Sequence, residues 1–347
     1  MPSPRVYVTR RLPGSALELL GEHTDLRVWD GETPPPRDDL LRQVAKCDGI
    51  VTLLTDRVDE ALLEAAPGLL AVSNMATGFD NVDVEAASRR NVLVTRTPGV
   101  LSETVADFTF ALILAAARRV TEADRHVRSG HWKNWGPQVM LGQDVYGATL
   151  GIVGLGGVGA EVARRARGFG MRLVYHSRTP RSALERRFGI QRLALSELLK
   201  QADFVSLHTP LTPETHHLIG RAELALMKRT AVLVNTGRGP LVDEAALYRA
   251  LLEEQIAAAA LDVADPEPMA PDNPLLSLER VIVTPHIASA SVATRSRMAT
   301  LAAQNLLTAL QGHLPDDTVN PQIGPSWRAV FEQHRLGAGH LGGGLNK

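Results

Sequence analysis

Three segments of the chain carry side chains that could bind an acid and move a proton. Arg238 lies in "VNTGRGPLVDE", Glu267 in "LDVADPEP" and His286 in "VIVTPHIASA". An arginine binds a carboxylate through two parallel hydrogen bonds, and a histidine exchanges a proton near neutral pH. A glutamate beside that histidine can orient the imidazole and favour its protonated form. Together these side chains predict a site that holds an acid and exchanges a proton with it.

A glycine-rich turn indicates a second kind of ligand. "TLGIVGLGGVG" places Gly154, Gly156 and Gly159 in GxGxxG spacing, directly after a hydrophobic run and before a helical pattern. In a dinucleotide-binding unit the first glycine permits the tight turn, the second admits the pyrophosphate, and the third lets helix and strand pack closely. Amides at the start of the helix would bind the phosphates, with Gly157 and Val158 in the same turn. The turn therefore predicts a bound dinucleotide.

The next segment, "LVYHSRTPR", bears on which dinucleotide it is. An NAD-binding chain normally presents an acidic residue to the adenosine ribose at this point, but this chain presents Ser177, Arg178 and Thr179. A serine does not repel a 2′-phosphate, and an arginine can bind one with two hydrogen bonds. We expect NADPH to be the preferred cofactor, with NADH possible. The alternative interpretation of Arg178 is a solvated surface charge.

Alternating elements must position these residues. Short β-rich runs alternate with helical patterns, which is typical of parallel α/β architecture. A first series of runs lies at 5–9, 26–30, 49–54, 69–73 and 92–95, and a second series begins with "TLGIVG" and ends with "VIVTP". Because ligands of open parallel sheets bind beyond the carboxyl ends of the strands, we expect the loops of the second series to converge on one site.

Helices connect and follow the two series. The segment 102–120 is apolar on nearly every face, which predicts a helix buried on all sides, either in the core or at a subunit interface. A last helix at about 291–311 could carry the chain back to the first series. The glycine-rich end of the chain predicts a disordered tail over 322–347.

Composition limits the partners and the compartment. The chain has 347 residues, of which 44% are hydrophobic and 22% charged, and its formal net charge is -1. We therefore expect no nucleic-acid and no membrane partner. The single cysteine, Cys47, suits a reducing cytoplasm. The densest apolar run, 108–117, is too short to cross a bilayer of roughly 30 Å. No metal site is predicted.

Several motifs together resemble the D-isomer-specific 2-hydroxyacid dehydrogenase family. "GLGGVG", "NTGRG", "LDVADPEP" and "TPHIASA" match its signatures in order and spacing, and the similarity extends over about residues 5–320. The resemblance implies an α/β protein with a flavodoxin-like substrate-binding domain at 1–100 and 290–321. A Rossmann dinucleotide-binding domain at 101–289 would be inserted into it, with a cleft between the two.

The resemblance also implies roles for individual residues. Arg238 would bind the carboxylate and keto oxygen of the substrate, and His286 would be the acid in reduction and the base in oxidation, with Glu267 as its partner. The backbone amides of Thr77 and Gly78 would bind the substrate carboxylate. Further implied cofactor contacts are Thr104, Pro210 on the adenine side, Thr236 and Gly237 near the nicotinamide, Asp262 at its carboxamide, His286 and Ala288. At Ala288 many relatives have a glycine, and the methyl group of the alanine could crowd the nicotinamide.

Within the family, the chain is most similar to glyoxylate/hydroxypyruvate reductases. The segment 129–147, "SGHWKNWGPQVMLGQDVYG", resembles their dimer loop, in which a tryptophan reaches the partner's active site, and Trp135 matches that position best. An ordinary interface anchor is the alternative for Trp132 and Trp135. The implied function is NAD(P)H-dependent, reversible reduction of glyoxylate and hydroxypyruvate to glycolate and D-glycerate by a homodimer.

Other activities within the family fit less well. Formate dehydrogenases have Gln where Glu267 stands, and phosphite dehydrogenases carry a Lys in the segment that here reads "MATGFDN". Phosphoglycerate dehydrogenases often add a regulatory domain, for which the tail is too short, although short forms exist. Dinucleotide-sensing corepressors keep the same three residues and would be binding modules rather than enzymes.

Overall fold

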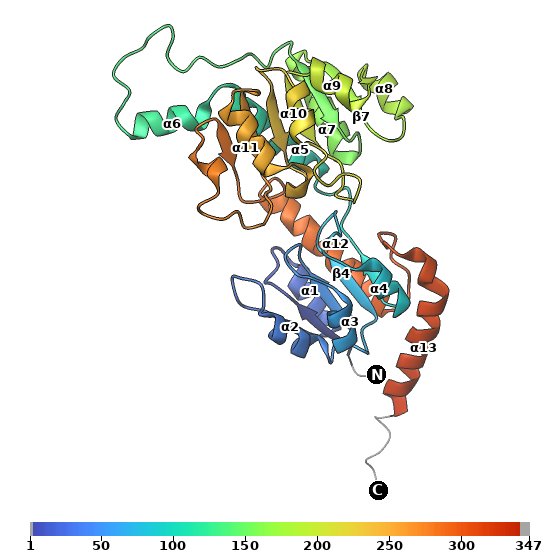
Figure 1. The fold of residues 1–347 in the computed structure, drawn as a ribbon. Helices are drawn as coiled ribbons and strands as arrows, with labels where there is room; N and C mark the ends of the chain where they lie inside the picture. The colour runs from blue at the N-terminus through green and yellow to red at the C-terminus, as the bar shows by residue number, and fades with distance from the viewer. Residues whose placement is uncertain (1–2, 341–347) are drawn as a thin grey trace. The chain divides into compact units, whose positions relative to one another are not determined.

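The computed structural model describes residues 3–340, which form two compact units (Figure 1). Within these residues, unit 1 consists of 3–100 and 291–340, and unit 2 consists of 101–290. The chain thus leaves unit 1, builds unit 2 and returns to unit 1. No helix in this part of the chain has the length and apolar character needed to span a membrane.

Unit 1 contains a parallel sheet. Its described strands have the order β2-β1-β3-β4-β5, which is the flavodoxin-like order expected from the resemblance. The strands are β1 (Arg5–Val8), β2 (Asp25–Val28), β3 (Gly49–Thr52), β4 (Ala71–Asn74) and β5 (Leu93–Thr95). The helices are α1 (Ala16–His23), α2 (Arg37–Val44), α3 (Glu60–Ala65), α4 (Val84–Arg89), α12 (Val292–Leu310) and α13 (Gly324–His340), with the 3-10 turn η4 (Pro321–Ile323).

The last helix corrects the prediction of a disordered tail over 322–347. From Gly324 to His340 the chain forms α13, whereas residues 341–347 lie outside the described part. Trp327 is fully buried and donates a hydrogen bond from Nε1 to the Leu70 carbonyl at 3.0 Å, and Phe331 is also buried. Because these aromatic side chains stand four residues apart, they lie on the same helix face, and this apolar stripe anchors the segment to unit 1.

Unit 2 contains a larger parallel sheet. Its described strands have the order β12-β11-β10-β9-β6-β7-β8, the Rossmann order with a further strand. The strands are β6 (Thr149–Val153), β7 (Arg172–His176), β8 (Gln191–Arg192), β9 (Phe204–Leu207), β10 (Val232–Asn235), β11 (Ala258–Leu261) and β12 (Val281–Val283). β9, β10 and β11 are buried along their whole length, as expected of parallel strands covered on both faces.

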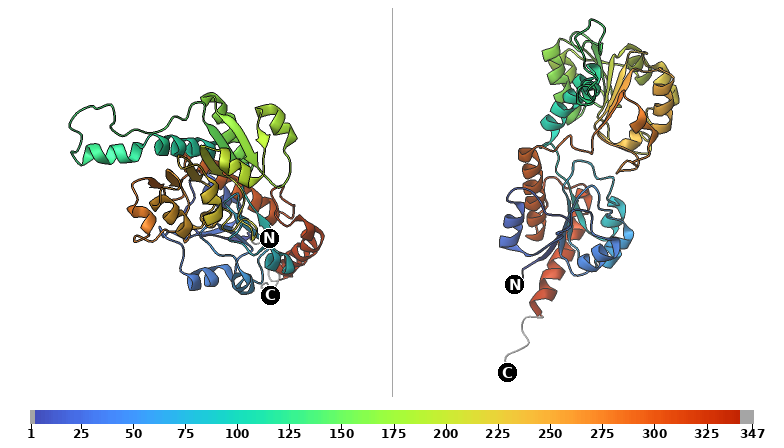
Figure 2. Two further views of the ribbon diagram at one scale, coloured as in Figure 1. Left: turned by 45° about the horizontal axis from the view of Figure 1, so that its top comes forward. Right: turned by 90° about the vertical axis from the view of Figure 1, so that its left-hand side faces the viewer.

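Helices cover both faces of this sheet (Figure 2). One hydrophobic core joins α5 and α7 to the sheet through Phe110, Ile113 and Val162. The other lies against α9, α10 and α11 and contains Leu198 and Leu224. The helices of unit 2 are α5 (Ser102–Ala117), α6 (Val120–Arg128), α7 (Gly157–Ala166), α8 (Ser182–Phe188), α9 (Leu195–Gln201), α10 (Arg221–Leu226) and α11 (Glu244–Leu252), with the 3-10 turns η1 (Arg167–Phe169), η2 (Gly239–Leu241) and η3 (Pro274–Ser277).

Helix α5 differs in part from its prediction. It ends at Ala117, and it is not buried on all sides, because Asp107 and Ala111 are exposed. Asp107 forms an ion pair with Arg165 of α7 at 2.6 Å. The other face of α5 packs on β10, β11 and α7 and is buried in the core.

Candidate active site

The side chains predicted to handle an acid and a proton lie at one edge of the unit 2 sheet. Arg238 follows β10, Glu267 follows β11 and His286 follows β12, and these strands are parallel neighbours. Since the carboxyl ends of parallel neighbours face the same way, the loops that carry the residues lie side by side. The convergence expected from the sequence is therefore present within unit 2.

Glu267 and His286 form a hydrogen-bonded pair. His286 Nδ1 lies 3.0 Å from Glu267 Oε2, and the amide of Ala264 donates to Glu267 Oε1 at 3.2 Å. Burial by itself would raise the pKa of Glu267. The hydrogen bond and charge of His286, the Ala264 amide and the charge of Arg238 outweigh that effect and lower the pKa. Glu267 is consequently an ionised partner for the imidazole at neutral pH.

The backbone holds His286 in an uncommon conformation. Its φ is 55°, in the left-handed region that non-glycine residues seldom adopt. The amide of His286 donates to the carbonyls of Asp262 at 2.8 Å and Thr284 at 3.0 Å, and these bonds maintain the conformation. Strained conformations of this kind cluster at functional sites, where the surrounding structure over-determines them.

Asp262 fixes the loop that carries the histidine. Its side chain is fully buried, and its carboxylate accepts hydrogen bonds from Thr284 Oγ1 at 2.6 Å and from the amides of Ile287 at 2.9 Å and Ala288 at 2.7 Å. Charged acceptors bind amides strongly, so Asp262 holds both sides of His286 in place. Its expected contact with the nicotinamide carboxamide stays a prediction.

The Arg238 loop packs against the loop after β11. Asn235 Nδ2 donates to the Arg238 carbonyl at 2.7 Å, and the amide of Gly237 donates to Asn235 Oδ1 at 3.0 Å. A Cβ atom at Gly239 would lie 1.9 Å from the Ala264 carbonyl oxygen, so only glycine permits this approach. The contact brings the guanidinium of Arg238 close enough to influence the charge on the Glu267 loop.

A second histidine at this edge cannot replace His286. His208 follows β9, and its Nε2 lies 2.7 Å from Ser206 Oγ. Burial lowers the pKa of His208 to about 3. Its imidazole is therefore neutral near neutral pH and is a poor proton donor there.

The glycine-rich turn has a shape that fits the phosphates of a dinucleotide. Gly154 has a φ of 98°, and a Cβ atom at Gly159 would lie 2.1 Å from the Gly154 carbonyl oxygen. At Gly156, in contrast, an added Cβ would meet no atom within 4 Å. Helix α7 begins at Gly157 and has no side-chain cap, and the first amides of a helix are a common binding site for phosphate. The turn thus combines close helix packing with room for a phosphate, as the sequence analysis expected.

The segment expected to contact the adenosine ribose follows β7, with Ser177 half-buried and Arg178 and Thr179 exposed. Ser177 Oγ donates to the Thr179 carbonyl at 2.6 Å, so this hydroxyl is engaged in the turn. The Arg178 side chain is exposed, and the charge of Arg178 lowers the pKa of Glu214, after the hydrogen bonds from Thr212 and the backbone. Arg178 is thus presented at the surface, near enough to Glu214 for its charge to act on that carboxyl group.

Arg192 supports this segment, a contact that the sequence analysis did not foresee. Its guanidinium donates to the Ser177 carbonyl at 2.9 and 3.1 Å and to the Arg178 carbonyl at 2.9 Å. Arg192 pairs with Tyr175 in the register of β8 against β7. The run at 190–193 predicts a short strand of the second series, and β8 confirms it. The contact of Arg192 with backbone carbonyls has no signal in the residue types.

The remaining predicted cofactor contacts lie at the same edge or on α5. Thr236 Oγ1 lies 3.0 Å from Thr109 Oγ1 of α5, and both residues are buried. Ala288 is buried, while Pro210 is exposed and its carbonyl accepts a hydrogen bond from Thr215 at 2.7 Å. Gly237 belongs to the Arg238 loop, Val158 to the first turn of α7, and Thr104 is half-buried in the first turn of α5.

The predicted carboxylate-binding amides belong to unit 1. Thr77 and Gly78 follow β4, and neither amide has a hydrogen-bond acceptor among the described residues. Thr77 Oγ1 donates to the Thr97 carbonyl at 3.1 Å, and Asn74 Nδ2 donates to the Gly78 carbonyl at 3.2 Å. Arg96 donates to the Thr77 carbonyl at 3.4 Å, which adds a cation to a segment that has none of its own.

The predicted dimer segment extends from unit 2. Helix α6 and the chain after it project beyond the body of the unit (Figure 1), and Trp135 has an exposed fraction of 83%. Trp132, Tyr146 and Leu141 are also exposed. A cavity of about 370 Å³ lies where this segment leaves and rejoins the unit, at the amino ends of β10, β11 and β12. It is therefore at the edge of the sheet opposite to the candidate active site.

These features define a class of protein. The protein combines a Rossmann sheet and a glycine-rich turn with a histidine that is paired with a carboxylate. This combination is typical of oxidoreductases that use a nicotinamide dinucleotide. Residues 110–288 match the family model described as "D-isomer specific 2-hydroxyacid dehydrogenase, NAD binding domain". The chain belongs to the D-isomer specific 2-hydroxyacid dehydrogenase family, as its motifs indicate.

Individual relatives agree along nearly the whole chain. A glyoxylate reductase of Korarchaeum cryptofilum is 54% identical over 321 residues, which cover 92% of this chain and 97% of the relative. A solved protein structure from Thermus thermophilus has a TM-score of 0.86 and 49% identity, covering 91% of this chain and 99% of that one. An NADPH-dependent glyoxylate/hydroxypyruvate reductase from Sinorhizobium meliloti, in complex with NADP and malonate, has a TM-score of 0.79 and 33% identity, covering 91% and 96%.

Proposed function

We propose that the protein reduces small 2-keto acids, glyoxylate and hydroxypyruvate, to glycolate and D-glycerate in a reversible reaction, with NADPH preferred over NADH. The observation that carries the proposal is the His286–Glu267 pair, 3.0 Å apart, in the loops next to that of Arg238. The similarity to glyoxylate reductases over 92% of the chain supports the choice of substrate.

His286 is the proton donor in this proposal. Its Nδ1 faces Glu267, so we assign the transferred proton to Nε2. The ionised carboxylate of Glu267 favours the imidazolium form, which can protonate the keto oxygen as negative charge develops on it. In the oxidation direction the neutral imidazole accepts the proton from the hydroxyl group. Asp262 acts through the backbone, because it holds the loop on which His286 stands.

Arg238 is the proposed carboxylate-binding residue of unit 2. The planar guanidinium of Arg238 can hold a carboxylate with two parallel hydrogen bonds, which a lysine cannot reproduce. Thr77 and Gly78 are proposed as further donors, since their amides have no acceptor within the described residues. With the carboxylate bound, the keto carbon has a defined orientation toward the proton donor.

The glycine-rich turn, Thr236 and Asp262 are the proposed binding residues for the dinucleotide. When bound in reduced form, its nicotinamide ring supplies a hydride to the keto carbon. Gly156 leaves the open space that the pyrophosphate requires, and the first turn of α7 provides amides and positive potential. Arg178 would bind the 2′-phosphate of NADPH, and the NADP complex of the Sinorhizobium meliloti relative supports this preference.

We further propose that the protein is a homodimer in which Trp135 completes the partner's active site. An exposed tryptophan on a projecting segment is costly in water and is typical of an interface residue. Trp135→Ala should alter the choice among 2-keto acids while leaving cofactor affinity nearly unchanged. Sedimentation analysis of the wild-type protein provides the check, since a fully active monomer would contradict the proposal.

Steady-state kinetics tests the function directly. Glyoxylate, hydroxypyruvate and larger 2-keto acids are each measured with NADPH and with NADH. We expect the highest kcat/KM for one of the two small acids with NADPH, and a raised KM for the keto acid in Arg238→Lys. NADPH binding without turnover of any 2-keto acid would instead indicate a dinucleotide-sensing binding protein.

A further inference from the structure

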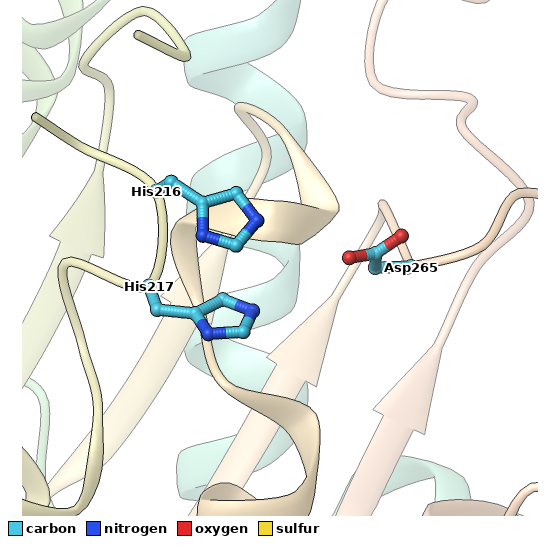
Figure 3. Close-up of side chains that lie close together, drawn as sticks. All are labelled: His216, His217 and Asp265. Carbon is cyan, nitrogen blue, oxygen red and sulfur yellow. The ribbon is translucent and has the colours of Figure 1, made fainter. Parts of the chain in front are cut away.

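Two histidines and an aspartate gather on the surface of unit 2, outside the proposed catalytic residues. His216 and His217 lie in the loop between β9 and α10, and Asp265 lies in the loop after β11 (Figure 3). One potential ligand atom from each side chain lies within 4.8 Å of the others. The two loops are separated in the sheet by β10, so the chain fold, rather than sequence proximity, brings these groups together.

Both loops are held in place by hydrogen bonds that their backbone amides donate. The amide of His217 donates to the Pro240 carbonyl at 2.7 Å, and that of Ile219 donates to the Leu241 carbonyl at 3.0 Å. The amide of Asp265 donates to Glu244 Oε1 at 2.8 Å. His217 also has a φ of 52°, a left-handed conformation that these contacts maintain. The backbone that carries the three side chains is therefore already held in the conformation that brings them together.

Ring stacking relates the two histidines to each other, but no described contact of their side chains accounts for the position of Asp265 beside them. Within residues 3–340 none of these three side chains forms a hydrogen bond or ion pair, and the two imidazole rings stack with centroids 4.0 Å apart. All three residues are exposed, so a bound ion would keep water molecules as further ligands.

We propose that His216, His217 and Asp265 bind a divalent transition-metal ion such as Zn²⁺. Imidazole nitrogens suit Zn²⁺, Co²⁺, Ni²⁺ and Cu²⁺, whereas Mg²⁺ and Ca²⁺ prefer oxygen ligands only. Two imidazoles and one carboxylate supply three protein ligands, and water completes the tetrahedral set. The site is separate from the proposed proton transfer, because His286 and Glu267 are not among its ligands.

Metal binding would join the two loops. The ion would connect the loop after β9 to the loop after β11, and Asp265 stands two residues before Glu267 in the second loop. An ion that binds the folded chain and not the unfolded chain stabilises the folded state, and the stabilisation grows with the logarithm of the ion concentration above Kd. We therefore expect Zn²⁺ to raise the melting temperature, a measurement that does not depend on the proposed enzymatic activity.

Isothermal titration of the untagged full-length protein with Zn²⁺ tests the site. His216→Ala and Asp265→Asn should each weaken binding by at least about tenfold, since loss of even an outer-shell partner typically costs that much. His131→Ala is the matched control, because His131 is an exposed histidine outside the cluster and should leave the affinity unchanged. Titration with Co²⁺ should give visible absorption bands that both ligand variants lose.

Three results would each overturn the proposal. The first is wild-type protein that fails to bind Zn²⁺. The second is ligand variants that bind Zn²⁺ with unchanged affinity and give the same Co²⁺ spectrum. The third is binding that disappears in His286→Ala but persists in His216→Ala, which would assign the ion to the Glu267–His286 pair. Circular dichroism of each metal-free variant distinguishes a lost ligand from a lost fold.

Discussion

Two regions at the same edge of the unit 2 sheet are built in different ways. The loop that carries His286 is held by the fully buried carboxylate of Asp262, which accepts three hydrogen bonds from it. The His286 amide adds two hydrogen bonds, which it donates to backbone carbonyls. The segment Ser177–Thr179 is largely exposed, and the Arg192 guanidinium supports it from outside. The conformation of the His286 loop is therefore fixed by buried groups, whereas that of Ser177–Thr179 is held by an exposed side chain.

The difference indicates what each region can tolerate. Proton transfer depends on positions correct to a fraction of an ångström, which buried charged hydrogen bonds provide. Selection between two cofactors that differ by one phosphate depends on charge. Exposed side chains can supply that charge without being positioned as precisely as the groups that transfer a proton. Substitutions in the His286 loop should therefore reduce the rate of the reaction, whereas substitutions in Ser177–Thr179 should change the preference between NADPH and NADH.

The largest effect is expected for His286→Ala. Loss of the proton donor should lower kcat by about 100-fold or more, in line with measured contributions of general acids. Steady-state kinetics at saturating NADPH and glyoxylate measures the effect, and an unchanged melting temperature shows that the variant is folded. A kcat near that of the wild type would remove His286 from the mechanism.

The next largest effect is expected in the exposed segment. The wild type should prefer NADPH by at least about tenfold in kcat/KM, because one charge-assisted hydrogen bond contributes about 1.5–3 kcal/mol. Ser177→Asp combined with Arg178→Ala should reverse this preference, since it adds repulsion and removes the cation. The change should appear mainly in the cofactor KM.

Arg186→Ala, an exposed arginine on α8, is the matched control for that double substitution and should leave the preference unchanged. Equal use of NADH and NADPH by the wild type would mean that Arg178 is only a solvated surface charge. The proposed reductase activity would still stand.

A smaller effect, visible in the pH dependence, is expected for Glu267→Gln. The pKa of Glu267 is lowered from its ordinary 4.5, so its carboxylate is ionised throughout the neutral range. That charge favours the imidazolium of His286, and its removal should make the reduction rate decline at lower pH than in the wild type. A pH–rate profile that does not move would separate Glu267 from the proton donor.

The smallest effect is expected for Arg192→Gln. Its hydrogen bonds to the Ser177 and Arg178 carbonyls are exposed, so their loss should reduce the NADPH preference by about fivefold, equivalent to about 1 kcal/mol. Arg192→Lys keeps the charge and loses the two-pronged geometry. If the lysine variant retains full preference, Arg192 acts through charge and not by supporting the backbone.

Much of the fold could be predicted because local patterns and strand order agree. The buried strand runs and the glycine-rich turn indicated two parallel sheets, and the residues just after β10, β11 and β12 indicated which side chains share an edge. Parallel topology is the reason that this worked. It converts a position at the end of a strand into a position in space.

Other features could not be read from the sequence for physical reasons. Arg192 acts through backbone carbonyls, which leave no trace in residue types. The sequence predicts no metal site, because His217 and Asp265 are far apart in the chain and match no ligand spacing. The α13 helix was missed because the glycines near the end of the chain outweighed the Trp327 and Phe331 stripe, whose burial depends on unit 1.

The glycine-rich turn also separates two kinds of evolutionary constraint. At Gly159 the protein itself excludes a side chain, because the Gly154 carbonyl occupies the space, so any substitution is selected against through stability. At Gly156 the folded chain leaves room for a methyl group, so the exclusion would come from the ligand. A lineage that ceased to use the dinucleotide would be free to lose Gly156 while it still retained Gly159.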